Sequence, residues 1–342
     1  MFKMAAWGDA FEQEMTATDW AGFDRLQAMY CESLLTDYAL IRDLREANYD
    51  VAMAESFDRC AFALFRHLRI LSTHVMSAIP LDEWTAHANG VPVDLLNTPI
   101  MFNNRQFTPL SSTWERLRNV YEYLRWRFHY MPESMRVVDS AIRKVFGADF
   151  PNSLELLGSV DYVWLNTNEH VAPARLLSAR IKSIGGIAVD KERALNEPMV
   201  VVPFFGDQHM NSAAAVGRGI AVAVDRRRLS ADGLVVALRR VLHDPAIRAA
   251  AADVRRKIRS APVDPAVLFA KTVEFAAENA GLRELHLPTT SAWDHAAVWS
   301  AIGGGLLFLS VVAFWTLRTA FALLSLVRRS FLFAAERAKK VE

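Results

Sequence analysis

The carboxyl-terminal part of the chain contains the run that most constrains how the chain can fold. No charged residue occurs from Val298 to Leu317, and Arg318 alone separates this run from a second apolar one, Thr319 to Val327. About 20 uncharged residues suffice for a helix to cross a bilayer. A buried core helix is the alternative, but surface and core helices of this length usually keep a polar face. We therefore predict one membrane-spanning helix here.

The residues beside this run predict the orientation of the span. Five basic residues follow it closely: Arg328, Arg329, Arg337, Lys339 and Lys340. Basic residues favour the cytosolic side, so the tail is predicted to be cytosolic and the bulk of the chain lumenal. The ending Lys339-Lys340-Val341-Glu342 has the form of a dilysine retrieval signal, which indicates the endoplasmic reticulum membrane. Residues 1–21 lack the continuous apolar stretch of a secretory signal.

Composition excludes two classes of protein. With 342 residues, 52% of them hydrophobic, the chain can bury a large core. Its 39 basic and 38 acidic residues give a formal net charge of +1, which offers no overall field to attract nucleic acid. Cys31 and Cys60 are the two cysteines, both in predicted helices, so we exclude a disulfide framework and interpret them as core thiols.

A β-α-β unit is predicted near the start of the chain. Tyr49–Ala54 is an apolar strand, Cys60–Leu68 a helix that Asp58 can cap, and Ile70–Ser77 the next strand. The two strands are then parallel neighbours. Glu55 lies just past the carboxyl end of the first strand, where open α/β sheets bind ligands. A solvated loop acid is the alternative.

The rest of the first half mixes helices with loop. The helix that Ser111–Thr113 can cap combines arginine with aromatic residues as far as His129, a mixture also found in nucleic-acid-binding and calmodulin-target helices. Because glutamates interrupt it, we prefer an amphipathic lid or core helix. The other predicted segments are a helix from Leu26 to Arg45, loop and short pieces from Ile79 to Leu110, a helix from Pro132 to Phe146, a strand from Val160 to Leu165 and a loop-rich domain end near Ile187.

A candidate ligand-binding segment follows the apolar strand Met199–Val202. It reads Pro203-Phe204-Phe205-Gly206-Asp207-Gln208-His209-Met210-Asn211, a glycine turn with an acid-amide pair at a helix start. This is the arrangement of a binding loop at the end of a parallel strand. Asn211 or Ser212 can cap the following helix. The predicted elements that follow are helix Ala213–Arg218, strand Ile220–Val224, and helices Leu234–His243, Ala246–Ile258 and Pro265–Asn279. Ser230 and Asp232 are predicted to start the first of these three helices.

These motifs resemble the UDP-glucuronosyltransferase family of membrane-anchored glycosyltransferases. The match in the second half rests on the Pro203 to Asn211 segment, Gly217-Arg218-Gly219, Asp244-Pro245 and the terminal span with its basic tail. In the first half, Cys31-Glu32-Ser33-Leu34-Leu35, Tyr49-Asp50-Val51 and Ile184-Gly185-Gly186-Ile187 look like the family's acceptor-binding domain, especially in nematode members. The resemblance implies an α/β fold of the GT-B type, with two Rossmann-like domains, the second incomplete, and one carboxyl-terminal transmembrane helix.

The resemblance also implies roles for four residues. Asp207, Gln208 and Asn211 would hold the sugar of a UDP-sugar donor, since a carboxylate and an amide can orient sugar hydroxyls. Glu55 would be the carboxylate that orients a histidine base, and it is a Glu where many members have Asp. A hexose or hexuronic acid would pass to a small lipophilic acceptor. No cofactor and no metal are expected, because the UDP-sugar is a co-substrate.

Two departures from the family pattern predict weak or absent turnover. The family's amino-terminal catalytic histidine has no match, since the first histidine here is His67, inside a predicted helix. Between Ile187 and Pro198 the family's Trp-x-Pro-Gln and His-x-Gly-Gly-x-x-Ser blocks are absent. Two further hypotheses follow: a non-catalytic, membrane-anchored partner that forms homo- or hetero-oligomers with family members, or an incomplete version of a working enzyme.

The predicted domain organisation has four parts. Residues 1–190 form the acceptor-binding domain without its first strand, and residues 191–292 form a remnant of the donor-binding domain. Residues 293–327 form the transmembrane segment, and residues 328–342 form the basic tail.

Overall fold

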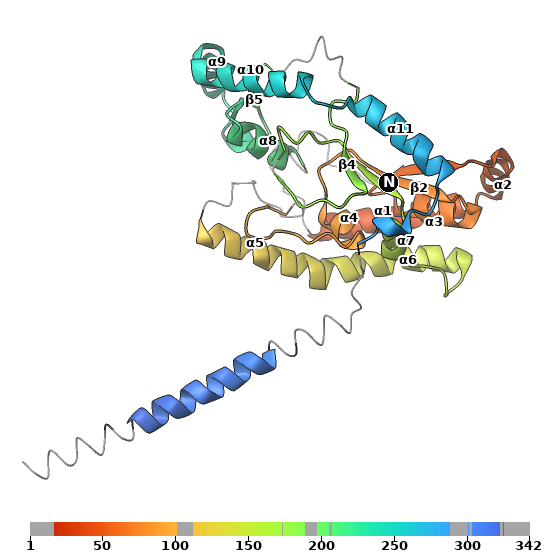
Figure 1. Cartoon of the computed structure of the whole chain (residues 1–342), viewed down its shortest axis with the longest axis horizontal. Helices are drawn as coiled ribbons and strands as arrows, with labels where there is room; N and C mark the ends of the chain where they lie inside the picture. Colours follow the sequence, from red (N-terminus) through yellow and green to blue (C-terminus); the bar gives the residue numbers. More distant parts are fainter. Residues whose placement is uncertain are drawn as a thin grey trace, which may run out of the picture. The chain divides into compact units, whose positions relative to one another are not determined.

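A four-stranded parallel sheet organises the first half of the chain (Figure 1). The computed structural model describes residues 17–100, 112–172, 174–188, 197–204, 207–287, 300, 303–321 and 324. Adjacent strands all run parallel, in the order β1 (Val51–Glu55), β2 (Ser72–Ser77), β3 (Tyr162–Leu165) and β4 (Ile181–Ser183). The strand β3 is buried along its whole length, as parallel strands covered on both faces are.

Helices pack around this sheet. Helix α3 connects β1 to β2, and the side chain of Asp58 accepts a hydrogen bond from the backbone N–H of Ala61 at 3.1 Å, so the predicted cap and β-α-β unit are confirmed. The helical segments of this half are α1 (Ala17–Leu35), α2 (Tyr38–Ala47), α3 (Arg59–Leu68), α4 (Glu83–Ala88), α5 (Thr113–Arg125), η2 (Trp126–Tyr130), α6 (Met131–Phe146) and α7 (Ser153–Gly158).

Three helix predictions need correction. The single helix predicted from Leu26 to Arg45 is two helices, because the side chain of Asp37 accepts from the backbone N–H of Leu40 and starts α2 afresh. The predicted break at Pro132 is absent, because proline fits the first turn of α6 and the π-helical segment η2 joins α5 to α6. Helix α4 lies in a stretch predicted to hold only loop and short pieces.

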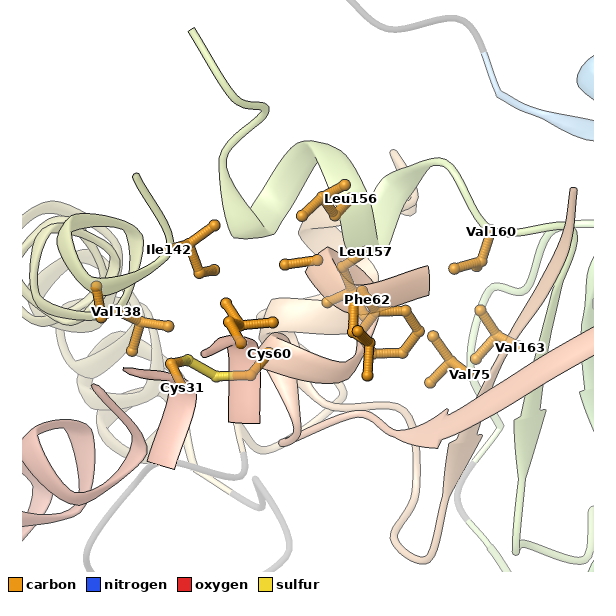
Figure 2. Close-up of a cluster of buried hydrophobic side chains, with 14 of the residues drawn as sticks. Cys31, Cys60, Phe62, Val75, Val138, Ile142, Leu156, Leu157, Val160 and Val163 are labelled. Atoms are coloured by element: carbon orange, nitrogen blue, oxygen red, sulfur yellow. A yellow bond between two sulfur atoms is a disulfide. The ribbon is translucent and has the colours of Figure 1, made fainter. Parts of the chain in front are cut away.

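The main apolar core lies between the sheet and helices α1, α3, α6 and α7, and part of it is shown in Figure 2. Cys31 of α1 and Cys60 of α3 are buried in this core and form a disulfide, with their Cα atoms 5.3 Å apart. The prediction of two core thiols is therefore wrong about their bonding, although it is right about burial. The two helices pack against each other, which brings together cysteines 29 residues apart in sequence.

A glycine pair follows β4 because the chain there passes very close to another loop. A Cβ atom at Gly185 would lie 2.3 Å from the carbonyl carbon of Thr167, and Gly186 has a φ of +93°. Only glycine accommodates such an approach and such a backbone angle without strain. The backbone N–H of Gly185 donates to the carbonyl oxygen of Thr167 at 2.9 Å.

The second sheet is small. Strands β5 (Met199–Val201) and β6 (Ala221–Ala223) pair in parallel, and α8 (Gln208–Gly217) connects them. Its core joins residues of α8, β6 and α10, among them Ala215, Ile220, Ala221, Ala251 and Val254. The remaining elements here are η3 (Arg226–Arg228), α9 (Ala231–His243), which Ser230 caps as predicted, and α10 (Pro245–Arg259).

The chain then returns to the first sheet. The ring of Phe269 in α11 (Pro265–Glu278) packs edge-on against Trp164 of β3, with centroids 4.8 Å apart. Beyond α11, the carboxylate of buried Asp161 accepts hydrogen bonds from the backbone N–H groups of Gly281 and Leu282, both at 3.1 Å. The short helix η4 (Arg283–Leu285) follows. Segments far apart in sequence therefore cover the same sheet.

Residues 288–342 form a separate compact unit. Within its described residues, one helix, Gly303–Phe321, is long and apolar enough to cross a membrane. None of its apolar window is buried. This helix lies inside the segment predicted to span the membrane.

Candidate functional site

Glu55 ends strand β1 and connects it to the segment that follows β2. One carboxylate oxygen, Oε1, accepts from the backbone N–H of Ser56 at 3.1 Å and from the Ser56 hydroxyl at 3.0 Å. The other, Oε2, accepts from the backbone N–H of Ala78 at 3.1 Å. The side chain is half-buried and fixed at the carboxyl edge of the sheet. The solvated-loop alternative is therefore wrong for Glu55.

The three predicted sugar-binding residues gather at the start of α8. Helix α8 begins at Gln208, three residues before the predicted caps, so Gln208 and Asn211 lie within its first turns and Asp207 precedes it. Asn211 Nδ2 donates to Asp207 Oδ2 at 2.7 Å. The Gln208 side-chain oxygen accepts from the backbone N–H of Phe204 at 2.9 Å, which holds the turn before the helix. Phe205 and Gly206 lie outside the described residues.

The buried side chain of Met210 places the start of α8 beside the edge that carries Glu55. Met210 packs against Phe57, which follows β1, and Ile79, which follows β2. Glu55 is two residues before Phe57, and its hydrogen-bond partner Ala78 directly precedes Ile79. The carboxyl edge of the first sheet and the amino end of α8 therefore meet across one apolar contact.

Arg175 strengthens this junction, and no local pattern of residues indicates its role. Its guanidinium lies 3.4 Å from the sulfur of Met210, and it donates to the carbonyl oxygens of Leu81 and Pro99. Burial lowers the pKa of Arg175, while the nearby carboxylates of Glu83 and Asp82 oppose this shift. Arg175 thus joins the loop after β2 to α8.

A buried polar network lies on the helix side of the same edge and was also missed. The Arg59 guanidinium pairs with Asp24 at 2.9 Å, with both side chains at most 9% exposed, and stacks over the ring of Trp84. Ser134 and Tyr130 donate to the same Asp24 carboxylate, at 2.6 and 3.2 Å. Burial and the Asp24 carboxylate together raise the pKa of Tyr130 well above its usual value. The adjoining cavity measures about 30 Å³ and has room for about one water molecule.

None of the hydrogen bonds described for the Glu55 carboxylate involves a histidine. All hydrogen bonds described for Glu55 come from Ser56 and Ala78. His67, the first histidine, stacks on Phe146 at the opposite end of α3. Among the described residues, no three His, Cys, Asp or Glu side chains gather as metal ligands would. The described part of the edge therefore offers hydrogen-bond acceptors and donors suited to hydroxyl groups.

Two parallel sheets with polar residues at the carboxyl edge define an α/β protein with a candidate ligand-binding edge, and comparison with known proteins gives the family. A sequence profile described as "UDP-glucoronosyl and UDP-glucosyl transferase" matches residues 2–197 and 193–329. The chain belongs to this family, which confirms the resemblance. The two matched segments overlap at residues 193–197, within the stretch from Ile187 to Pro198 where the family's two sequence blocks have no match.

Individual relatives agree with the family. Over 191 residues the chain is 26% identical to ugt-56 of Caenorhabditis elegans, which covers 55% of this chain and 35% of that protein. Over 190 residues it is 27% identical to UDP-glucuronosyltransferase 2B7 of Homo sapiens, which covers 53% and 36%. The chain thus matches about a third of the length of these relatives.

A solved glycosyltransferase is similar at low identity. The chain aligns with the glycotransferase of kitacinnamycin at a TM-score of 0.45 and 15% identity, over 76% of this chain and 83% of that one.

Proposed function

We propose that this chain carries the acceptor half and the sugar-contacting part of a UDP-glycosyltransferase. The observation that supports this most directly is the junction at Met210, which brings the start of α8 beside the edge that carries Glu55. In a GT-B enzyme, the donor sugar and the acceptor must meet between the two sheets. The division of the chain into an acceptor-binding domain (1–190), a remnant of the donor-binding domain (191–292), a transmembrane segment (293–327) and a basic tail (328–342) is part of this proposal.

Each site residue has a distinct proposed role. Asp207 and Asn211, which already hydrogen-bond each other at 2.7 Å, bind hydroxyl groups of a hexose or hexuronic acid. The amide nitrogen of Gln208 donates a hydrogen bond to the sugar, while its side-chain oxygen accepts from the backbone N–H of Phe204. Glu55 is the carboxylate of the acceptor side, which in this family's chemistry orients a histidine base. The acceptor is a small lipophilic alcohol or phenol.

We expect donor binding to be weak and turnover slow or absent. The blocks that bind uracil, ribose and diphosphate in the family have no match between Ile187 and Pro198, so most of the donor's binding energy lacks a source. The Glu55 carboxylate also accepts hydrogen bonds from Ser56 and Ala78 rather than from a histidine. The first feature predicts weak donor binding, and the second predicts slow turnover.

Calorimetry with UDP-glucuronate and UDP-glucose tests the donor site. The wild-type chain should bind in the millimolar range or more weakly, and Asp207→Asn should weaken binding a further ~10-fold, because it removes a charge-assisted hydrogen bond worth about 1.5 kcal/mol. Asp232→Asn is the matched control, since Asp232 lies in the first turn of α9, an exposed helix start. Tight, micromolar binding that depends on Asp207 would contradict the expected weakness. Binding unchanged by Asp207→Asn would remove Asp207 from the site.

A non-catalytic partner role is the second candidate, and the surface of α9 favours it. Val235, Val236, Leu238 and Leu242 of α9 are each at least 43% exposed. A two-stranded parallel sheet is also smaller than such sheets normally are. Association with a full-length relative would cover these apolar side chains. Co-purification of the tagged chain with a full-length relative tests the role, and a strictly monomeric protein would exclude it.

The chain is proposed to sit in the endoplasmic reticulum membrane with its bulk in the lumen. The helix Gly303–Phe321 supplies the single span, and the basic tail that follows supplies the orientation. The Cys31–Cys60 disulfide supports a lumenal body, because disulfides persist in oxidising compartments. Protease protection of intact microsomes is the test: the body should survive and a carboxyl-terminal tag should be removed.

A further inference from the structure

Helix α5 and the segment η2 expose a continuous apolar stripe that no role above uses. Trp114, Leu117, Tyr121, Leu124 and Phe128 are between 45% and 73% exposed. They recur at alternating spacings of three and four residues, which places all five on one face of a helix. We call this face the α5 stripe. Figure 1 shows α5, η2 and α6 as one long rod at the border of the body.

The opposite face of the same rod supplies the contacts with the protein. Asn119 and Trp126 are 1% and 4% exposed and point inward. Asn119 alone makes three hydrogen bonds, to the backbone of Leu95, Thr98 and Ile100. The helix is therefore fixed by its polar and aromatic inner face, and the side chains of the α5 stripe each stay at least 45% exposed.

Arginines flank the α5 stripe on both sides. At 3.6 residues per turn, Arg118 and Arg125 lie along one border, and Arg116 and Arg127 lie towards the other. Arg127 stacks over the ring of Phe128 at 5.7 Å, and Arg125 pairs with Glu122 at 2.8 Å. An apolar face rich in Trp, Tyr and Phe between two rows of arginine is the pattern of a helix that lies in a membrane interface.

A second copy of the chain fits this face less well. Five such side chains offer on the order of 600 Å², whereas a stable interface needs ~800 Å² from each partner. A symmetric pair would also bring arginine rows towards each other, which is repulsive. Lipid phosphate groups instead complement those rows.

We propose that the α5 stripe docks the body onto the bilayer that the helix Gly303–Phe321 crosses. The inference rests on the proposed span for proximity: the chain from Leu287 to Gly303 can extend at most about 55 Å. The stripe inserts its aromatic and leucine side chains to the depth of the head groups and first acyl carbons, and the arginines bind lipid phosphates. Docking would hold the carboxyl edge of the first sheet near the membrane, where lipophilic acceptors concentrate.

Fluorescence quenching in the full-length chain tests the docking. A dye is attached at Leu117→Cys, or at Ser140→Cys as the control; Ser140 is exposed on the same rod, in α6, but off the stripe. The introduced cysteine is the only free thiol, since Cys31 and Cys60 are paired. The chain is reconstituted in vesicles of phosphatidylcholine and phosphatidylglycerol that carry a spin-labelled lipid. We expect at least twofold quenching at position 117 and little at position 140.

Each outcome decides the proposal. Equal, weak quenching at both positions overturns it, and so does cross-linking between copies through position 117 without lipid quenching, which would assign the stripe to a second copy. Resistance to carbonate extraction, measured on the same vesicles, reports the span separately. Quenching therefore decides the docking whichever result the extraction gives. Circular dichroism of the two labelled variants verifies that both are folded.

Discussion

At the scale of single residues, burial inside the first sheet keeps His74 neutral at pH values where a free histidine is protonated. It lies fully buried on β2, its Nδ1 accepts from the indole N–H of Trp164 at 3.0 Å, and its Nε2 lies 3.1 Å from the hydroxyl of Ser72. Burial lowers its pKa to about 4, although the nearby Asp161 carboxylate opposes the shift. The folded chain therefore holds a neutral histidine.

This pKa predicts a dependence of stability on pH. The unfolded chain protonates His74 near pH 6.5, but the folded chain does so only near pH 4. The stabilisation from neutral His74 is thus complete above about pH 6.5 and is lost as the pH falls towards 4, by roughly 3 kcal/mol. In urea titrations from pH 7 to 4.5, the free energy of unfolding of His74→Gln should fall less steeply with decreasing pH than that of the wild type. His243→Gln, at an exposed helix end, should leave it unchanged. An equal slope in wild type and His74→Gln would contradict the assignment.

Individual site residues were predictable to different degrees. Glu55 could be placed at a strand end because β1 is read from a local run of apolar residues, and its position there is confirmed. Its partner Ala78 could not be named, since it belongs to the loop after the next strand. Arg175 gave no signal at all, because its partners come from three separate loops and helices.

At the scale of elements, the disulfide between α1 and α3 makes a measurable contribution. Closing a loop of 29 residues should stabilise the folded chain by roughly 3.5 kcal/mol, mainly by restricting the unfolded state. Reduction by dithiothreitol should lower the free energy of unfolding of the wild-type chain, measured by urea titration, by that amount and lower the midpoint accordingly. A Cys31→Ala, Cys60→Ala double variant should start at about the reduced midpoint and not respond to dithiothreitol. A wild-type midpoint indifferent to the reductant would show that the pair contributes no stability.

Three helix starts followed a predicted cap, whereas the cap Asp37 at the start of α2 was not predicted. Asp58, Ser112 and Ser230 each accept from a backbone N–H two or three residues into their helix, as predicted. Helix α8 departed from this pattern because no side chain caps it: Asp207 precedes the helix but hydrogen-bonds Asn211 instead of a backbone N–H. A cap predicts a boundary only when the side chain is not engaged elsewhere.

At the scale of the whole molecule, the return of α11 to the first sheet joins the two sheets into one unit of residues 1–287. Asp161 is the polar anchor of that return, with two backbone N–H groups on its carboxylate. Asp161→Ala leaves the buried backbone N–H of Leu282 unpaired, while that of exposed Gly281 can bind water, and should lower the free energy of unfolding by roughly 1–3 kcal/mol. Denaturation followed by circular dichroism measures this loss. Asp149→Ala, at an exposed position, is the control, and equal midpoints for the two variants would refute the role.

The sequence by itself determined what depends on short stretches of chain. The charge-free carboxyl-terminal run, the β-α-β unit and the helix caps each arise from interactions within a few residues, so periodicity and residue type were enough. The family resemblance carried by Pro203 to Asn211 was visible in the same way, because a binding loop is one continuous segment.

Tertiary structure alone decided how distant segments meet. The disulfide between Cys31 and Cys60 and the packing of Met210 against Phe57 and Ile79 are such contacts. The hydrogen bonds of Asn119 are another, because they place one face of α5 against the protein and leave the α5 stripe facing outward. An amphipathic pattern names two faces of a helix but not which one the protein covers. That choice depends on contacts between residues far apart in the chain, which no local pattern records.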